Sequence, residues 1–263
     1  MASVVPRTVG DHLRAWRQRR RMSQLDLALE AEISQKHLSF VESGRSAPSR
    51  GMVLRLAERL DVPLRERNTL LLAAGYAPLY PQRTLDDPLL APARRAVELI
   101  LKGHEPYPAL AVDRTWTILA ANAAVAPLLA LVADRALVTP PVNALRVSLH
   151  PRGLAPRILN LAEWRAHILE RLRRQIAATG DDKLSVLLRE LLGYPGPELD
   201  EPTDYGGVLV PLRLTAPAGP LAFFSTTTVF GTPRDVTLSE IAVEAFFPAD
   251  EATAARLLPS PER

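Results

Sequence analysis

Apolar side chains recur at helical spacing through the first part of the chain. Val9, Leu13 and Trp16, for example, share one face of residues 9–20, and arginines cover the remaining faces. The same reasoning predicts helices over residues 9–20, 24–31, 35–42, 50–60 and 64–74. Five short helices of this kind make a complete small all-α domain, which we assign to residues 1–75.

Capping residues mark the ends of these helices. Ser23, with Asp26 three residues later, forms a reciprocal capping signal, and Ser34 can cap the helix over residues 35–42. Gly44 follows that helix where a left-handed C-terminal cap is expected. Two helices joined by a tight turn, the second with a polar outward face, predict a helix-turn-helix.

The spacing of this stretch resembles the repressor-type (Xre or lambda-repressor-like) helix-turn-helix family. The family pattern S-Q-x-x-L-A, A-G-V/I-S, L/I-S-x-x-E-x-G and P-S is met by Ser23, Gln24, Leu27, Ala28, Ala31, Ile33, Ser34, Leu38, Ser39, Glu42, Gly44, Pro48 and Ser49. Glu32 stands where the family has its turn glycine, and a positive φ there would cost on the order of 1 kcal/mol. The resemblance also implies that Arg17 pairs with Glu42 and that Gln24 donates to a DNA phosphate.

The helix over residues 35–42 is only about 13 Å long, so it can present its first two turns to a major groove of similar width. Gln35 suits adenine and Lys36 suits guanine, because of their hydrogen-bonding groups. Phe40 could touch a thymine methyl, contact a partner subunit or simply be exposed, and His37 could contact a base or a phosphate. The predicted DNA-binding residues are Gln24, Ser34, Gln35, Lys36, His37, Ser39, Phe40, Arg45 and Arg50, the two arginines as phosphate contacts. One such domain covers few base pairs, so we expect a homodimer on a double-stranded operator with an inverted repeat.

The hydrophobic period changes after a proline-rich linker and connecting helix at residues 76–103. Residues 109–120 predict a hairpin that turns at Asp113 and Arg114, and Asn122 can cap a helix reaching residue 132. Further helices are predicted over 142–149, 161–178 and 183–192, a loop over 194–204, and strands over 208–214, 221–230 and 241–247. We therefore expect an α+β domain at residues 104–258, with an antiparallel sheet and helices against one face. Its element order resembles a PAS-type fold.

The same segment resembles the ligand-binding domain of MmyB-like transcription regulators. The runs ALAVDRTWTILAAN, NALRVSLHPRGLAPRILN, VPLRL, FFSTTTVFGTP and VEAFFPADEAT carry the resemblance. It implies a small-molecule sensor joined to a DNA reader and leaves the ligand open.

Aromatic and basic residues within this domain are candidate ligand contacts. A buried arginine needs an anion, either an acid of the fold or a ligand carboxylate, and His150 either caps a helix or contacts a ligand. An elongated apolar acid, similar to a fatty acid, would satisfy both aromatic walls and an arginine. The predicted ligand-binding residues are Trp116, Arg146, His150, Trp164, Arg213 and Phe224. The alternative is that the domain only dimerises or binds a partner protein, with its aromatic residues serving as core.

Composition narrows the function classes further. With 47% hydrophobic residues among 263 and no stretch near the roughly 18 apolar residues of a membrane span, the chain fits a soluble cytoplasmic protein without a signal peptide. No cysteine is present, which excludes disulfides, thiolate metal sites and thiol nucleophiles. The nucleophile-elbow, phosphate-loop and dinucleotide-binding patterns are absent, and the five histidines form no H-x-x-x-H pair. We therefore expect no enzyme activity, no metal and no cofactor other than a bound fatty-acid-like ligand.

Charge is distributed unevenly along the chain. Residues 1–80 hold 13 Lys and Arg against 8 Asp and Glu, whereas residues 181–263 hold 6 against 13. A basic front suits a protein that approaches a polyanion with one end.

Overall fold

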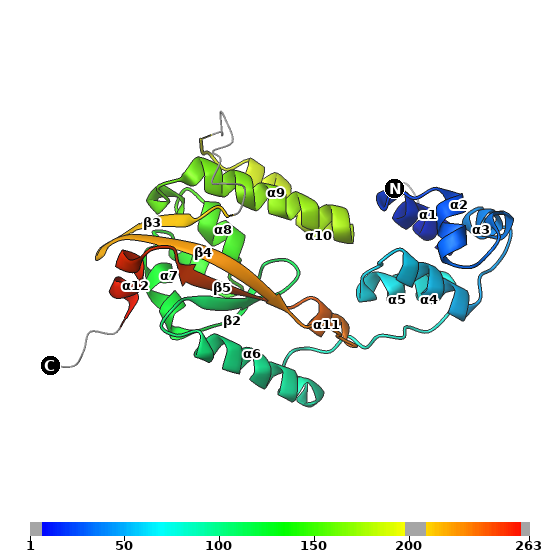
Figure 1. Ribbon diagram of the computed structural model, residues 1–263, viewed down its shortest axis with the longest axis horizontal. Helices are drawn as coiled ribbons and strands as arrows, with labels where there is room; N and C mark the ends of the chain where they lie inside the picture. The colour runs from blue at the N-terminus through cyan, green and yellow to red at the C-terminus, as the bar shows by residue number, and fades with distance from the viewer. Residues whose placement is uncertain (1–6, 198–208, 259–263) are drawn as a thin grey trace. The chain divides into compact units, whose positions relative to one another are not determined.

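The computed structural model describes residues 7–197 and 209–258 (Figure 1). The chain folds into two compact units, an N-terminal helical unit and a C-terminal α+β unit. Each unit has its own hydrophobic core, and the two are described separately below.

The N-terminal unit consists of five helices around one apolar core. The helices are α1 (Val9–Arg19), α2 (Gln24–Glu30), α3 (Gln35–Glu42), α4 (Arg50–Arg59) and α5 (Leu64–Ala73). The side chains of Ser23, Ser34 and Ser49 accept hydrogen bonds from the backbone N–H groups of Asp26, His37 and Met52, so the predicted caps at Ser23 and Ser34 are present and Ser49 caps α4 in the same way. Leu13, Leu27, Leu38, Leu56 and Leu70 are fully buried at the centre. The predicted helices are thus confirmed, with ends that move by about one residue.

The helix-turn-helix turn depends on a left-handed residue. Glu32 has φ 56°, and the N–H of Ile33 donates to the carbonyl of Ala28 at 2.9 Å, which closes the end of α2. Glycine is the residue that adopts this conformation without steric cost. The strain that the sequence predicted at Glu32 is therefore present.

We expect Glu32→Gly to stabilise the N-terminal unit by about 0.5–1 kcal/mol, because it removes the Cβ penalty at a positive φ. Chemical denaturation of the full chain, followed by hydrogen exchange in residues 9–75, measures the change. Glu58→Gly, within helix α4, is the matched control and should cost about 1 kcal/mol. A loss of stability in both variants would show that Glu32 makes a contact worth more than its strain.

The C-terminal unit is built on a five-stranded antiparallel sheet. The strands are β1 (Ala109–Val112), β2 (Ile118–Ala121), β3 (Leu212–Ala216), β4 (Gly219–Val229) and β5 (Ala242–Pro248), in the spatial order β2-β1-β5-β4-β3. The helices are α6 (Ala91–Gly103), α7 (Ala126–Ala130), α8 (Ala144–Leu149), α9 (Leu161–Thr179), α10 (Asp182–Leu192), α11 (Val236–Ser239) and α12 (Glu251–Leu257). The predicted α+β class with a PAS-like antiparallel sheet is confirmed.

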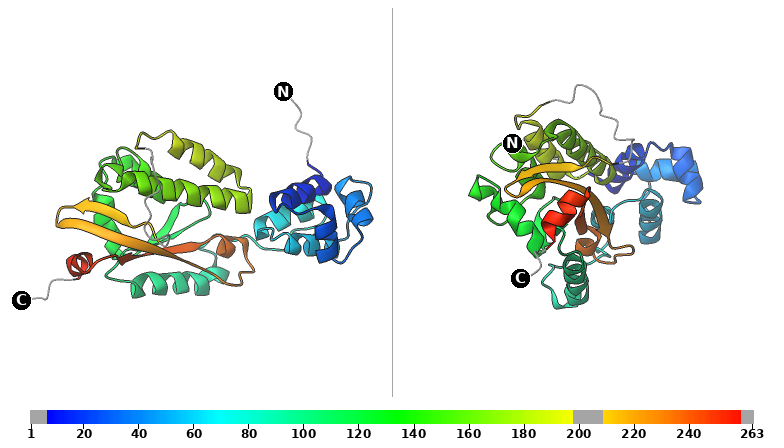
Figure 2. Two further views of the ribbon diagram at one scale, coloured as in Figure 1. Left: turned by 45° about the horizontal axis from the view of Figure 1, so that its top comes forward. Right: turned by 60° about the vertical axis from the view of Figure 1, so that its left-hand side comes forward.

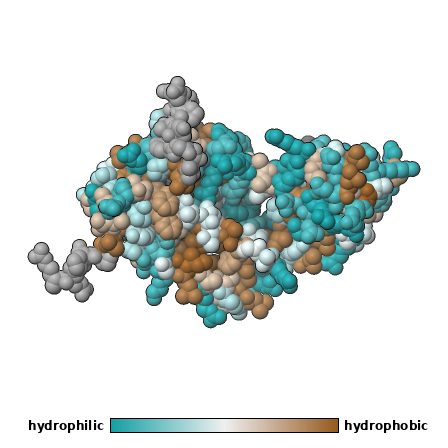
Figure 3. All heavy atoms as spheres, in the orientation of Figure 1, coloured by the Kyte–Doolittle hydropathy of each residue, from teal (hydrophilic) through white to brown (hydrophobic). Residues whose placement is uncertain are grey.

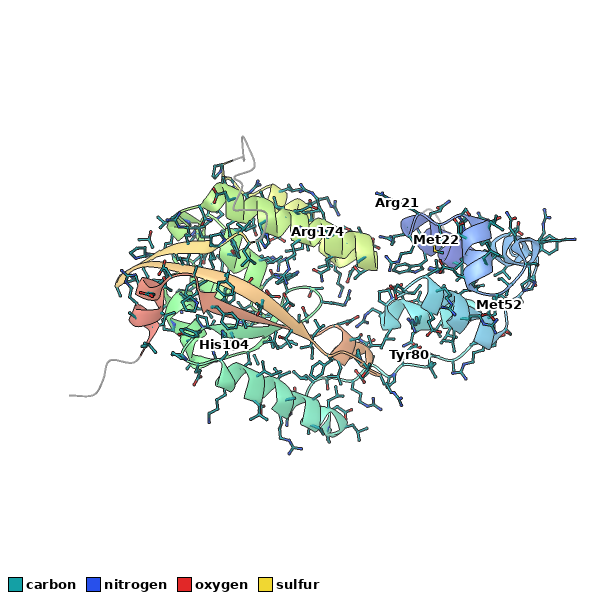
Figure 4. The ribbon with its side chains drawn as sticks, viewed as in Figure 1. Arg21, Met22, Met52, Tyr80, His104 and Arg174 are labelled. Atoms are coloured by element: carbon teal, nitrogen blue, oxygen red, sulfur yellow. The ribbon has the colours of Figure 1, made fainter. Side chains whose placement is uncertain are left out.

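Helices cover both faces of this sheet. Figure 2 shows the α9–α10 pair on one side of the strands and α6 on the other. The large core lies on the α8–α9–α10 side, and Val97 and Leu101 of α6 pack on Ala109, Ala111 and Val243 on the opposite side. His104, labelled in Figure 4, ends α6 and donates from Nε2 to the carbonyl of Phe246 at 2.8 Å. The prediction of helices on one face was therefore incomplete, because α6 closes the second face.

Asn122 does not cap the helix predicted after the hairpin. Its side-chain oxygen accepts from the N–H of Ala109, and its Nδ2 donates to the carbonyls of Leu101 and Tyr107 at 3.1 and 2.8 Å. A 3₁₀ turn over Ala123–Val125 and the short α7 replace the longer helix, and Asn122 instead ties α6 to the first strand.

Further differences between the predicted and the observed elements lie in the C-terminal third of the chain. The predicted strand at 208–214 begins at Leu212 in the structure, and residue 208 lies outside the described residues. Of the predicted loop at 194–204, residues 194–197 have no regular structure, and 198–204 lie outside the described residues. Helix α12 was not predicted, although Asp250 caps it by accepting from the N–H of Thr253 at 2.6 Å.

Candidate DNA-binding surface and ligand cavity

Helix α3 presents polar side chains at its start and an apolar face behind them. Leu38 and Val41 are fully buried, whereas Gln35 and Lys36 are exposed on the first turn. The Ser34 hydroxyl accepts from the N–H of His37 at 3.1 Å and so fixes the start of the helix. The geometry leaves Gln35 and Lys36 free to meet the edges of base pairs.

Intramolecular contacts occupy part of the α3 surface beyond Gln35 and Lys36. The His37 Nε2 lies 3.2 Å from the Sδ of Met52, the α4 residue labelled in Figure 4, and this contact is partly buried. Phe40 is half-buried, and its ring lies 5.7 Å from the Lys36 Nζ and 6.0 Å from the Arg45 Cζ. Two cations therefore flank the Phe40 ring, which combines an apolar surface with positive charge.

Two arginines that follow α3 on the chain are exposed. The N–H of Arg45 donates to the carbonyl of Phe40 at 2.8 Å, so the turn after α3 has a defined conformation, with Gly44 at φ 74°. Arg50 is the first residue of α4, which Ser49 caps. Both side chains are exposed and neither makes a hydrogen bond within the described residues, which leaves them able to contact phosphates.

A buried carboxylate joins the end of α3 to the two preceding helices. The Glu42 side chain is 0% exposed and accepts from Arg17 Nε at 2.7 Å and Nη2 at 2.9 Å. Gln24 Nε2 donates to the same carboxylate at 2.8 Å, and Arg14 Nη2 donates to the Glu42 backbone carbonyl at 2.9 Å. The predicted Arg17–Glu42 pair is thus present, with Gln24 as a third member.

The environment of Glu42 favours its charged form. Burial alone would raise the pKa of Glu42, but hydrogen bonds from Arg17 and Gln24 and the charges of Arg17 and Arg14 outweigh it and hold that pKa below its ordinary value. Gly10 lets α1 approach closely enough for this network, because a Cβ there would lie 2.5 Å from the Val41 carbonyl oxygen. Gln24 keeps a second N–H for a phosphate, so its predicted DNA contact remains a prediction.

An apolar cavity lies between the sheet and the helices of the C-terminal unit. The volume of this cavity is about 90 Å³, several times what one water molecule needs. Its lining comes from the sheet, α7, α8 and α9, and is mostly aliphatic and aromatic. The lining residues are Leu110, Trp116, Ile118, Val125, Leu128, Leu129, Ala144, Leu145, Val147, Ser148, Leu154, Trp164, Ile168, Arg171, Leu212, Leu214, Ser225, Glu244 and Phe246.

One ion pair supplies the charged groups of this lining. Arg171 donates from Nη1 to Glu244 Oε2 at 2.9 Å and from Nη2 to Glu244 Oε1 at 2.5 Å. Thr227 also donates to Glu244 Oε1, at 2.9 Å, and the Arg171 guanidinium lies 4.6 Å from the centre of the Trp116 ring. Both charges are therefore satisfied within the fold.

Each of the two units matches a known protein family. The helix-turn-helix family matches residues 13–67, and the MmyB-like transcription regulator ligand-binding domain matches residues 93–258. The chain belongs to the MmyB-like transcription regulators. The family that the sequence indicated is confirmed, and this regulator is a DNA-binding protein with a ligand-binding domain.

Other comparisons add little to this assignment. No curated protein matches the chain. A solved structure described as "Structure of an RNA-binding Light-Oxygen-Voltage Receptor" is 14% identical, with a TM-score of 0.25 over 95% of this chain and 61% of that chain. The MmyB-like regulator thus spans less than two thirds of that chain, and so low a TM-score does not indicate a shared fold.

The predicted ligand contacts of this MmyB-like regulator fall into two groups. Trp116 and Trp164 line the cavity, and their indole N–H groups donate to Gln175 and Ser148, each at 2.9 Å. Phe224 does not line it, since it stacks on Phe247 on the opposite face of the sheet, with ring centres 5.3 Å apart. Phe224 therefore lies outside this cavity, because successive residues of β4 point to opposite faces of the sheet.

The three polar residues predicted as ligand contacts also lie outside the cavity. Arg146 donates from Nε and Nη2 to the carboxylate of Glu190, each at 2.8 Å, so an acid of the fold serves as its anion. His150 is the C-terminal cap residue of α8, and its ring packs edge-on against Tyr194. Arg213 is exposed, and none of the three lines the cavity.

Sequence reasoning missed the polar residues that do line the cavity. Arg171, Glu244, Ser148 and Ser225 come from α9, β5, α8 and β4, four separate elements. The strand pattern held one usable signal, because Glu244 interrupts a nearly continuous apolar run and an acid there must be buried with a partner.

Within residues 7–197 and 209–258, no helix is long and apolar enough to cross a membrane. In the same residues, no group of three or more acidic or histidine side chains could hold a metal ion.

Proposed function

We propose that this MmyB-like regulator binds a specific operator through α3 and that a small, mainly apolar molecule in the C-terminal cavity changes its operator affinity. The observation that supports this most is an apolar cavity in the very unit that matches the ligand-binding family. Ligand sites are typically apolar clefts with a few placed polar groups. A ligand shifts operator affinity by its differential affinity for two states of the protein, and by no more. We place this activity in the cytoplasm.

The proposed contacts divide into base and backbone contacts. Gln35 and Lys36 read base edges, since both are exposed at the start of α3. Phe40 and Ser39 follow on the same helix, with Lys36 and Arg45 beside the Phe40 ring. Gln24, Arg45 and Arg50 contact phosphates. Ser34 and His37 complete the surface, since the Ser34 hydroxyl caps the start of α3 and the His37 ring contacts Met52 of α4.

We expect Gln35→Ala and Arg50→Ala to weaken DNA binding in different ways. Gln35→Ala should cost about 1–3 kcal/mol on the operator and relax one base position, with little effect on random duplex. Arg50→Ala should weaken both duplexes alike and flatten the salt dependence of binding. Fluorescence anisotropy on an operator selected from a random duplex pool, at several salt concentrations, measures both effects. Equal losses on both duplexes for both variants would contradict the assigned roles.

We further propose a homodimer that binds an inverted repeat. Figure 3 shows apolar residues gathered over α6 and the adjoining strand. Leu99 and Ile100 of α6 are 71% and 40% exposed, and Val229 of β4 is 62% exposed. A second copy of the chain would cover this apolar surface and supply the second half-site reader.

A second candidate function is a DNA-binding regulator whose C-terminal domain serves only for dimerisation or protein interaction. The same exposed residues on α6 favour it. The two candidates differ in whether the cavity takes a ligand. Both matched families are regulator domains, and we propose no catalysed reaction.

A further inference from the structure

We infer that the cavity selects uncharged apolar molecules with a hydroxyl or carbonyl group and rejects carboxylates. This inference rests on the proposed ligand-binding function and names the ligand class for that same cavity. It departs from the fatty-acid-like ligand that the arginines of the sequence suggested.

The charge of the cation in the cavity lining is already compensated by an acid of the fold. Arg171 is the one cationic side chain among the lining residues that the structure describes. Its guanidinium makes two hydrogen bonds to Glu244, a third to Thr227 at 2.8 Å, and packs on the Trp116 ring. These contacts use three of the five N–H groups of Arg171, and the bidentate pair compensates its charge.

Glu244 makes a ligand carboxylate unfavourable. This residue is only 3% exposed, and its carboxylate contributes negative charge to the lining. A ligand carboxylate would either lie beside the Glu244 charge or draw Arg171 away and leave the buried Glu244 with only the Thr227 hydroxyl as its partner. Both arrangements place an uncompensated anion in an apolar site, which is strongly unfavourable.

Two hydroxyl groups remain for a neutral ligand. Ser225 on β4 makes no side-chain hydrogen bond within the described residues, although it lines the cavity. Ser148 on α8 accepts from the Trp164 Nε1 at 2.9 Å and keeps its own O–H free to donate. A ligand hydroxyl or carbonyl can therefore bond to the sheet, to α8 or to both, while the rest of the molecule contacts apolar walls.

The test compares three probes of one chain length: decanol, methyl decanoate and decanoate. Trp116 and Trp164 line the cavity, so their fluorescence in the full-length protein reports binding, with Trp16→Phe removing the background from the N-terminal unit. We expect both neutral probes to bind at least about tenfold more tightly than decanoate. The Ser148→Ala/Ser225→Ala double variant should lose about tenfold for decanol.

Glu244→Gln should reverse the preference, because it frees the Arg171 charge. Decanoate is expected to gain at least about tenfold in this variant, while decanol changes little. Glu190→Gln is the matched control, since Glu190 also pairs bidentately with an arginine but lies outside the lining, and it should keep the wild-type ranking.

The possible outcomes separate this inference from the proposed function. Decanoate binding to the wild-type protein as tightly as decanol would overturn the neutral ligand class and leave the ligand cavity standing. Failure of all three probes to change tryptophan fluorescence or the melting temperature would overturn the cavity as an apolar ligand site and the inference with it. If Glu244→Gln does not fold, the wild-type ranking and the serine variant still decide.

Discussion

Replacing Glu42 by alanine is expected to destabilise the helix-turn-helix unit by about 3–5 kcal/mol. The side chain is completely buried, and its loss would leave Arg17, only 12% exposed, without its anion. Gln24 would lose its acceptor as well. Since the pair joins α1 to the last residue of α3, we also expect the variant to bind operator weakly at temperatures where the unit is partly unfolded.

A double-mutant cycle isolates the Arg17–Glu42 interaction. The Arg17→Ala/Glu42→Ala protein should be more stable than Glu42→Ala alone, because it no longer buries an unpaired guanidinium. Calorimetry of the full chain, with hydrogen exchange in residues 9–75, assigns the loss to the correct unit. Glu30→Ala is the control, since Glu30 is exposed on α2 and should change stability by no more than about 0.5 kcal/mol. Additive effects of the two single changes would contradict the coupling.

The low pKa of Glu42 gives this contribution a defined pH dependence. A carboxyl whose pKa is lower in the folded than in the unfolded state stabilises the fold above the unfolded pKa, and loses that contribution as pH falls through the folded pKa. The stability difference between the wild type and Glu42→Ala should therefore be constant above about pH 5 and shrink below it. A difference that grows towards acid pH would contradict the ion pair.

Filling the cavity is expected to abolish ligand binding without unfolding the protein. Ala144 lines the cavity at the start of α8, and Ala144→Phe would place a ring in the empty volume. A ligand at a hundred times its Kd stabilises a protein by about 2.7 kcal/mol, and this whole gain should vanish in the variant. The variant without ligand should lie within about 1–3 kcal/mol of the wild type, because added contacts offset the strain of overpacking.

Thermal unfolding with and without decanol measures the effect. Ala126→Phe serves as the control, since Ala126 is exposed on α7 and lies outside the lining, so it should keep the full ligand-induced shift. An equal shift in Ala144→Phe and the wild type would mean that the ligand binds elsewhere.

The helix-turn-helix could be predicted from sequence in detail because local chemistry determines it. Ser23, Ser34 and Ser49 cap helices from positions that the sequence alone identifies, and Gly44 adopts the left-handed φ that its place after α3 predicts. Even the long-range Arg17–Glu42 pair followed from a spacing shared across the family. These contacts depend on neighbours within a few residues or on one fixed motif.

The cavity depends on strand register and on side-chain direction, which the sequence specifies less directly. Phe223 and Phe224 look equivalent in sequence, yet Phe223 is fully buried in the core beside the cavity and Phe224 stacks on Phe247 on the opposite face. Arg146 and Arg171 both lie near apolar residues, and only the packing of α8, α9 and α10 decides that one pairs with Glu190 and the other with Glu244. Asn122 likewise matched a cap signal, but three backbone groups from distant residues occupy its side chain.

The central claim is that occupation of the cavity controls operator binding, and one titration tests it most directly. The full-length protein is freed of co-purified small molecules, and its Kd for a selected operator is measured with and without saturating decanol, for the wild type and for Ala144→Phe. We predict that decanol changes the wild-type Kd by at least about fivefold and leaves that of Ala144→Phe unchanged. The same Kd for the wild type in both conditions, despite decanol bound in the cavity, would contradict the claim.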